Sequence, residues 1–400
     1  MKKFFALLLA LLMMLGCCAF AEDASAGDSA GDSAGDSAGD STGESAEVPA
    51  VEAKSVLVLV PSLGDGSYFA AAALGAEALI EKYPGTTVEK IAMGAIPMDM
   101  ANAEYELATY LPFFTDACES GKYDLIITCG AECNHALLAA AKAYPEQLFV
   151  SVDLQGVPAE LAETPLANVY GVTYKVKDLG YLAGYVACAV TTSNMEKANP
   201  EKKVGVIVGM DFPGLNEYIG GFVQVCAENG VEVYIDYAGD FVVEIAPQVA
   251  EKAKAMYDAG VDVIWQVAGG AGSGVFTAAK EADKYAFGVD CDQSATIADP
   301  AEAATIVTSF YSDYAAVIDY VFSTMLEGNF PGGTYPQVGL AEGFVGYANN
   351  DQFKAMVSAD VVDGIAALYE KMASGEVEVF SVEADPAGWE ALKQATAPAN

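Results

Sequence analysis

The stretch VIWQVAGGAGSG, residues 263–274, and the stretch YAFGVDCDQ, residues 285–293, decide the fold. Each opens with a short apolar run of the kind found in strands buried on both faces. The first run ends in a glycine-rich turn, and the second ends at Asp290 and Asp292. In open α/β sheets the carboxyl ends of neighbouring strands meet at one edge, where such folds bind small molecules. The two stretches therefore predict one wall of a ligand site.

Apolar runs alternate with helical patterns along most of the chain. The predicted strands are 55–61, 125–128, 148–152, 204–209, 231–237, 263–267 and 285–288. The predicted helices include 67–83, 134–144, 213–229 and 245–259, and Gly230 and Gly260 follow the last two as C-terminal stops. This alternation predicts an α/β fold with parallel sheets that carry helices on both faces, and with a break near residues 171–178.

The N-terminus predicts export. A basic start, Met1-Lys2-Lys3, precedes an apolar run over residues 4–15 that is too short to span a bilayer. Two cleavage sites compete. The box MLGC, residues 14–17, would leave a lipidated Cys17, whereas AFA, residues 19–21, suits ordinary signal peptidase. We favour lipidation at Cys17.

An Ala-Gly-Asp-Ser repeat follows the signal region. It is too poor in apolar side chains to offset the entropy of ordering its backbone, so we expect a flexible acidic linker. A flexible linker of about 29 residues has a root-mean-square end-to-end distance of roughly 30 Å. Such a spacer suits a folded domain that is held away from a membrane.

The charge balance excludes some partners. The chain has 19 basic and 56 acidic residues and a net charge of −37. No basic cluster is present to neutralise phosphates, which argues against nucleic acid and disfavours polyanionic ligands. The acidic surface is sufficiently explained as a means of keeping an exported protein soluble.

The cysteines do not predict a disulfide framework. Of the eight, Cys17 and Cys18 belong to the signal region and the other six are scattered. We expect free thiols, with Cys188, Cys226 and Cys291 acting as small core side chains. The segment CGAECNH, residues 129–135, brings two cysteines and the single histidine together, but it lacks a second ligand pair, so no metal site is expected.

Several motifs resemble one known family, the basic membrane protein family of ABC-transporter substrate-binding lipoproteins, which includes purine nucleoside receptors. The similar segments run from residue 56 to about residue 380. They are NVYG (168–171), YLAG (181–184), GMD (209–211), GGF (220–222), GDF (239–241), QVAGGAGSGV (266–275) and GVDCDQ (288–293). The resemblance implies a type I periplasmic-binding fold, in which two Rossmann-like lobes joined by a multi-strand hinge close on a ligand.

This resemblance also implies a division of the chain. Residues 1–21 form the signal peptide and residues 22–51 the acidic linker. The first lobe comprises residues 52–172 and 298–330. The second lobe comprises residues 173–297 and 331–390.

The resemblance implies roles for individual residues. Tyr68 and Phe241 would sandwich a planar base, and Asp290 would accept hydrogen bonds from ribose hydroxyls. Gly269 and Gly270 would let backbone N–H groups approach the ligand. Each aromatic side chain could instead belong to the core, and Asp290 could instead cap a turn.

Three positions depart from the family pattern. Phe69 stands where the family has an asparagine that reads the base, and Ala70 replaces the usual aspartate. Ser312 replaces a lysine close to the sugar. Phe69 therefore becomes a candidate ligand contact itself, and the ligand is less constrained than the transport role.

The expected function is that of an extracytoplasmic substrate-binding protein of an ABC importer with a purine nucleoside as ligand. Its partners would be the permease subunits and, through a lipid anchor, the membrane; we expect a monomer without cofactor or metal. One alternative is a tethered receptor for another flat small molecule.

A nucleoside-processing enzyme is a further alternative. The chain lacks several motifs that such enzymes use. Val275 stands where a dinucleotide-binding fingerprint needs its third glycine, there is no P-loop signature, and a single histidine excludes an HExxH zinc site.

Overall fold

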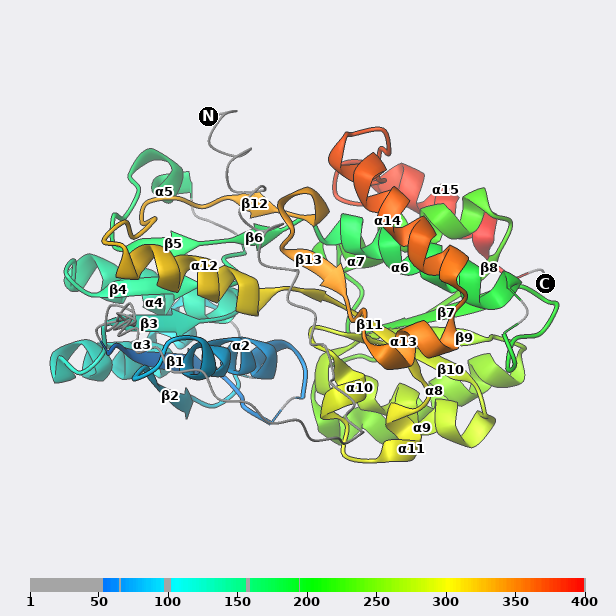
Figure 1. Cartoon of the computed structure of the whole chain (residues 1–400), viewed down its shortest axis with the longest axis horizontal. Helices are drawn as coiled ribbons and strands as arrows, with labels where there is room; N and C mark the ends of the chain where they lie inside the picture. Colours follow the sequence, from blue (N-terminus) through cyan, green and yellow to red (C-terminus); the bar gives the residue numbers. More distant parts are fainter. Residues whose placement is uncertain (1–52, 65, 97–101, 156–158, 194, 399–400) are drawn as a thin grey trace, which may run out of the picture. The chain divides into compact units, whose positions relative to one another are not determined.

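The computed structural model describes residues 53–64, 66–96, 102–155, 159–193 and 195–398. The signal region, Cys17 and the acidic linker lie outside these residues, so the predictions made for them stay predictions. The described part is α/β, with two main sheets (Figure 1).

The first sheet has the strand order β2-β1-β3-β4-β5, and all its pairings are parallel. Its strands are β1 (Ser55–Val60), β2 (Thr87–Ala92), β3 (Leu125–Thr128), β4 (Leu148–Ser151) and β5 (Val169–Gly171). The helices that belong to it are α2 (Tyr68–Lys82), α3 (Ala103–Ser120), α4 (Ala131–Ala143), α5 (Ala159–Glu163) and α12 (Tyr314–Leu326).

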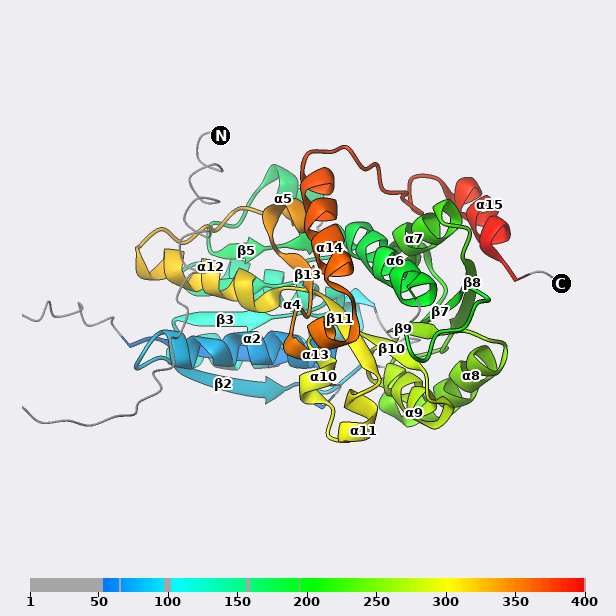
Figure 2. The same ribbon diagram turned by 45° about the vertical axis from the view of Figure 1, so that its right-hand side comes forward.

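Alternation along β1 explains how this sheet is covered. Val56, Val58 and Val60 join the core on one face, whereas Leu57 and Leu59 join a separate core with Tyr110 and Phe114 of α3. Successive strand side chains point to opposite faces, so a continuous apolar run buries both. Helices α2 and α12 lie along one face of this sheet in both ribbon views (Figures 1 and 2), and they pack against each other.

The second sheet has the order β13-β11-β10-β9-β7-β8 and is parallel except for the pairing of β11 with β13. Its strands are β7 (Lys203–Val208), β8 (Glu232–Tyr237), β9 (Val263–Val267), β10 (Tyr285–Val289), β11 (Ile306–Ser312) and β13 (Val345–Tyr347). The larger helices around it are α6 (Val176–Thr192), α7 (Pro213–Glu228), α8 (Ala246–Asp258), α9 (Ser273–Ala282), α14 (Ala359–Ala373) and α15 (Pro386–Thr396). Shorter segments are η2 (Val243–Ile245), η3 (Gly269–Gly272), α10 (Gln293–Thr296), α11 (Pro300–Ala303), η4 (Leu340–Glu342) and α13 (Asp351–Met356).

The chain passes between the two sheets more than once. It first crosses through β6 (Thr173–Tyr174), which pairs with β12 (Gln337–Val338), within the break predicted at residues 171–178. After β11 it returns to the first sheet as α12, and it then re-enters the second sheet as β13. These crossings form the multi-strand connection expected of the fold.

The structure bears out the fold class and most predicted elements, with small differences. The two runs of the opening stretches form β9 and β10, and Gly230 and Gly260 have the left-handed φ values 63° and 93°. The helix predicted from residue 134 begins at Ala131, because Gly130 at φ 99° turns the chain directly out of β3. Strand β11 belongs to the second sheet although residues 298–330 were expected in the first lobe, so the chain crosses one strand later than expected.

Candidate functional site

The candidate site forms where strands of both sheets reach their carboxyl ends. Ser67 follows β1 in the first sheet, and Asp290 follows β10 in the second. The Ser67 hydroxyl donates a hydrogen bond to Asp290 Oδ2, and the amide side chain of Gln293 donates to the Gly66 carbonyl at 3.2 Å. These contacts join the two sheets at the residues after their strands, which is the position expected for the ligand.

Asp290 has an uncommon backbone conformation. Its φ is 66°, a left-handed value that aspartate and asparagine adopt more readily than most residues. Its backbone N–H donates to the Phe310 carbonyl at 3.1 Å. The strand end therefore turns abruptly at Asp290 and directs its carboxylate to Ser67.

On the side of the first sheet, Tyr68 is paired with a carboxyl group that the sequence analysis did not identify. The Tyr68 hydroxyl donates to Asp153 Oδ2 at 2.6 Å, and Gln155 Nε2 donates to the same oxygen at 2.8 Å. Asp153 follows β4 and is 3% exposed. Within the described part of the chain both donors use Oδ2, which leaves Oδ1 as an acceptor.

Burial raises the pKa of Asp153 to about 6, although the Tyr68 and Gln155 hydrogen bonds act against that rise. Glu132, at the start of α4, lies near Phe69, because a side chain at Gly130 would meet both. Burial raises the pKa of Glu132 to about 7, and the charges of Asp153 and Glu106 add to the effect. The first-sheet side thus holds two carboxyl groups that take up a proton close to neutral pH.

Aromatic rings surround these acids. Tyr68 packs edge-on against Phe69, with ring centroids 5.0 Å apart, and against Tyr314 at 6.1 Å. Both Tyr68 and Phe69 are partly exposed rather than wholly in the core. Tyr218 of α7 belongs to the same group, because the charges of Asp153 and Asp290 both raise its pKa after the larger effect of burial.

One buried hydroxyl in this group lacks a partner. Tyr174 is 6% exposed, and among the described residues no group forms a hydrogen bond with its hydroxyl. Its ring lies 5.5 Å from that of Tyr314, and after burial the Asp153 charge is the next cause of its raised pKa. A buried hydroxyl without a partner is costly, so this position suits a polar atom of a ligand.

Phe241, Gly269 and Gly270 form a second group at the end of β9. The Phe241 carbonyl accepts a hydrogen bond from Ala271 N–H at 3.0 Å, and Gly269 has φ 54° and lies against the Phe241 ring. Gly270 is buried, and its carbonyl accepts from Ser273 Oγ at 2.8 Å. The structure thus brings the three residues together, while their contact with a ligand stays a prediction.

The glycine-rich turn also has a structural cause. A side chain at Gly272 would collide with Gln266, which is buried in β9. Gln266 Nε2 donates to Gln293 Oε1 at 2.6 Å, and that oxygen also accepts from Val289 N–H at 2.9 Å. This amide pair ties the end of β9 to the end of β10. Trp265 of β9 is fully buried.

The two cysteines and the histidine of residues 129–135 lie in different surroundings. His135 is half-exposed and pairs with the buried Glu106 at 2.5 Å, whereas Cys129 and Cys133 are buried in different cores. In the described segments no group of three histidine, cysteine or acidic side chains is placed to hold a metal ion. Ser312, at the end of β11, is buried.

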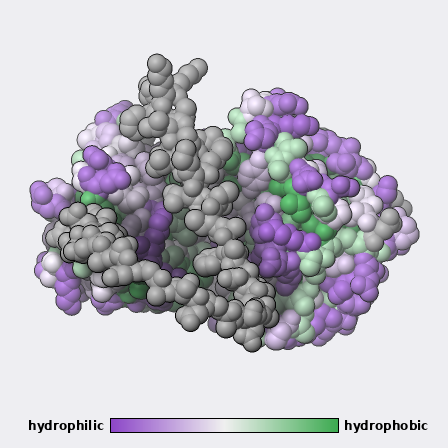
Figure 3. Space-filling model, in the orientation of Figure 1, coloured by the Kyte–Doolittle hydropathy of each residue, from purple (hydrophilic) through white to green (hydrophobic). Residues whose placement is uncertain are grey.

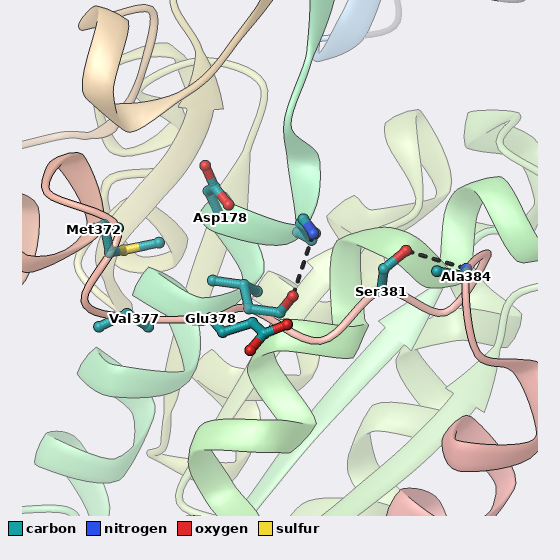
Figure 4. A pocket seen from close by; sticks show the side chains of 9 residues that line it. Asp178, Met372, Val377, Glu378, Ser381 and Ala384 are labelled. Atoms are coloured by element: carbon teal, nitrogen blue, oxygen red, sulfur yellow. Dashed lines mark hydrogen bonds between the residues drawn. The ribbon is translucent and has the colours of Figure 1, made fainter.

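A surface hollow of about 490 Å³ lies between the start of α6 and the segment that follows α14 (Figure 4). Asp178 and Met372 line it, and Lys177 Nζ donates to the Val379 carbonyl at 3.2 Å beside it. It contains none of the predicted ligand residues. We therefore take the strand ends, where Tyr68, Asp153 and Asp290 converge, as the candidate site.

Two α/β lobes with strand ends that meet at a polar and aromatic site define a ligand-binding protein of the periplasmic-binding type. The chain belongs to the Bmp family, the PnrA-like ABC transporter substrate-binding proteins, whose family model matches residues 53–382. It is thus an ABC transporter substrate-binding protein, and the resemblance noted in the sequence is confirmed.

Individual relatives and one solved structure are similar to this chain. A Lactococcus lactis protein named ABC transporter nucleoside-binding protein BmpA is 29% identical over 280 residues, which cover 66% of this chain and 74% of that protein. The CD4+ T-cell-stimulating antigen of Listeria innocua is 30% identical over 270 residues, covering 64% and 70%. A solute-binding protein of an Aeropyrum pernix ABC transporter system shares the fold, with a TM-score of 0.65, 23% identity and coverage of 86% of this chain and 99% of that one.

Proteins of this class act outside the cytoplasm. Among the described residues, no helix has the length and apolar character that a membrane crossing requires. In Figure 3 hydrophilic residues lie on both sides of the visible face, with hydrophobic residues among them.

Proposed function

We propose that this protein captures a purine nucleoside and presents it to the permease of an ABC importer. The observation that carries the proposal is the convergence of Tyr68 and Asp153 from the first sheet with Asp290 from the second. An aromatic face, a carboxyl group that can accept from the base and a carboxylate that can accept from the sugar can together bind a nucleoside.

Asp153 can make the polar contact with the base that is lost because Phe69 stands in place of the family's asparagine. Its Oδ1 can accept from an N–H or amino group on the edge of a base, while Tyr68 and Gln155 hold Oδ2. A charge-assisted hydrogen bond of this kind is stronger than one between neutral groups. The proposal therefore favours bases with hydrogen-bond donors on their edge, such as guanine or adenine.

Asp290 supports recognition of the ribose. The Ser67 hydroxyl that it binds occupies the place where a ligand hydroxyl would donate. Two vicinal hydroxyls can bind one carboxylate together, which selects a nucleoside over a free base. This function does not require the protein to make or break a covalent bond, so we propose no catalytic role for it.

A second candidate ligand is a flat cation. All 19 basic residues of the chain are lysines, and Ser312 replaces the lysine expected close to the sugar. The charges that act on Glu132 come from Asp153 and Glu106, and such an acidic, aromatic environment also suits a cationic ring. A cationic ring has no sugar to bind to Asp290, so the two candidate ligands differ in whether a sugar contacts this residue.

Membrane attachment is part of the proposal. A lipid on Cys17 followed by the acidic linker would hold the folded part near the permease while leaving it free to move.

The test is to identify the small molecule that remains bound through purification. Protein purified in volatile buffer is measured by native mass spectrometry, and the released compound is fragmented. A purine nucleoside supports the proposal. A compound without a ribose, or a cationic ring, would contradict the nucleoside assignment and favour the second candidate.

A further inference from the structure

Helices α6 and α7 of the second lobe lie in unusually close contact. Side chains at Gly180 and Gly184 of α6 would collide with the backbone of Tyr218 and Phe222 of α7. These pairs are separated by the same number of residues, so the helices run alongside each other in a fixed register. The glycines let the two backbones approach because they carry no side chain.

Continuing this register by one helical turn leads to a pair of cysteines. Residues four positions apart lie on the same face of a helix, so Cys188 follows Gly184 as Cys226 follows Phe222. The structure bears this out: Cys188 Sγ and Cys226 Sγ lie 3.8 Å apart. Cys188 is 6% exposed and Cys226 is fully buried.

We infer that Cys188 and Cys226 form a disulfide in the exported protein. The two helix backbones lie close together at the glycines, and the two sulfur atoms face each other. Only a short movement of the two cysteine side chains is therefore needed to reach bonding distance. The expectation of free thiols came from scattered sequence positions. It did not include the register that brings these two together.

The bond forms by thiol–disulfide exchange with an external disulfide, either a small-molecule disulfide or an oxidised protein dithiol. One cysteine thiolate attacks that disulfide, releases one thiol and forms a mixed disulfide. The second cysteine then attacks its partner's sulfur and releases the second thiol. Two protein thiols are oxidised, one external disulfide is reduced to two thiols, and the balance is complete.

The burial of the two cysteines determines the stage at which the disulfide forms. It raises the pKa of Cys226, with Cys188 adding to the effect, so the folded core holds little thiolate. Exchange therefore takes place after export and before α6 and α7 have finished packing. The finished bond closes the loop from residue 188 to residue 226 and stabilises the second lobe.

The test uses the full exported chain, produced once by secretion into an oxidising compartment and once in a reducing cytoplasm. Each sample is unfolded without reductant, its thiols are alkylated, and peptides are analysed by mass spectrometry. We expect Cys188 and Cys226 to escape alkylation and to appear as one cross-linked peptide in the secreted sample. Cys118, which is partly exposed on α3, is expected to be alkylated in both samples.

Thermal unfolding supplies an independent measurement. Reductant is expected to lower the Tm of the secreted protein by roughly 5 °C, an effect that Cys188→Ala removes and Cys118→Ala retains. If Cys188→Ala does not fold, Cys226→Ser provides the same comparison. Full alkylation of Cys188 and Cys226 in the secreted protein, or a cross-link from either to another cysteine, would overturn the inference.

Discussion

At the scale of single residues, the candidate site depends on carboxyl groups in unlike environments. Asp153 is buried under Tyr68 and Gln155 with its pKa near 6, whereas Asp290 stands at a turn in a left-handed conformation and binds Ser67. The first suits contact with a base and the second contact with a sugar. Their different surroundings permit separate tests.

We predict that Asp290→Asn weakens binding of purine nucleosides by about tenfold or more, because it removes a charge-assisted acceptor worth about 1.4 kcal/mol or more. Asparagine tolerates φ 66°, so the Tm should stay close to that of the wild type. Isothermal titration calorimetry and thermal unfolding measure the two effects. A large fall in Tm with unchanged affinity would show that Asp290 is structural. Alanine is a poorer choice because it would strain this turn.

Because the pKa of Asp153 is raised, we expect pH to have opposite effects on nucleoside binding and on the stability of the fold. Binding uses the ionised carboxylate, so nucleoside affinity should fall as the pH drops from 7.5 to 5, through the pKa of about 6. The folded pKa lies above the unfolded value of 3.8, so the stability that this group contributes is present at low pH and is lost as the pH rises through about 6.

Asp153→Asn is the matched control for this pH dependence. It keeps an oxygen for the Tyr68 hydroxyl and removes the titration of this residue while Glu132 still titrates, so affinity should be lower at pH 7.5 and should change less down to pH 5 than in the wild type. Titration calorimetry at several pH values, with urea unfolding at the same values, checks both trends. An unchanged pH profile in the variant would exclude Asp153 as the titrating group.

The sequence allowed part of this site to be predicted. Asp290 was found because an acidic residue follows a buried strand, and the same rule applied to the strand 148–152 would have found Asp153. Tyr218 could not be found in this way. It lies within the regular pattern of α7, and its closeness to Asp153 and Asp290 depends on how the two sheets meet.

At the scale of elements, strands buried on both faces were the easiest to predict. β3 and β9 have the predicted bounds, and every residue of both strands is buried. β2 lies at a sheet edge, and its sequence TVEKIA is largely exposed, so no such run marks it. β13 gains its place through antiparallel pairing with β11, a contact that local sequence does not encode.

The packing of α6 on α7 makes a specific prediction. In Gly180→Ala the new methyl group would meet the Tyr218 carbonyl, and backbone cannot move aside as a flexible side chain does. We expect a loss of about 3 kcal/mol in the free energy of unfolding, measured by urea denaturation. Gly214→Ala is the control, because its nearest neighbour, a Glu383 oxygen at 3.5 Å, is at ordinary contact distance. Equal stability of the two variants would refute this account of the packing.

At the scale of the whole molecule, residues 53–382 belong to one family of ABC transporter substrate-binding proteins, and the motifs near residues 266–293 pointed to it. The α/β fold was predictable from its buried apolar runs, and the class of protein from the resemblance of motifs such as residues 266–275 and 288–293 to the family. The ligand was not, since Phe69, Ala70 and Ser312 alter the positions that would read it.

The anchor prediction also belongs to this scale. Mass spectrometry of the mature N-terminus should find a diacylglyceryl-modified Cys17 in protein extracted from membranes. A mature chain that begins at Glu22 would show cleavage by ordinary signal peptidase instead, and the protein would then be secreted.

Titration calorimetry tests the central claim most directly. The protein is unfolded and refolded to remove bound ligand, and is then titrated with purine nucleosides, pyrimidine nucleosides and free bases. We predict micromolar or tighter binding of at least one purine nucleoside, and much weaker binding of its free base because the contact of the sugar with Asp290 is lost. Refolded protein with its normal Tm that binds no purine compound would contradict the claim.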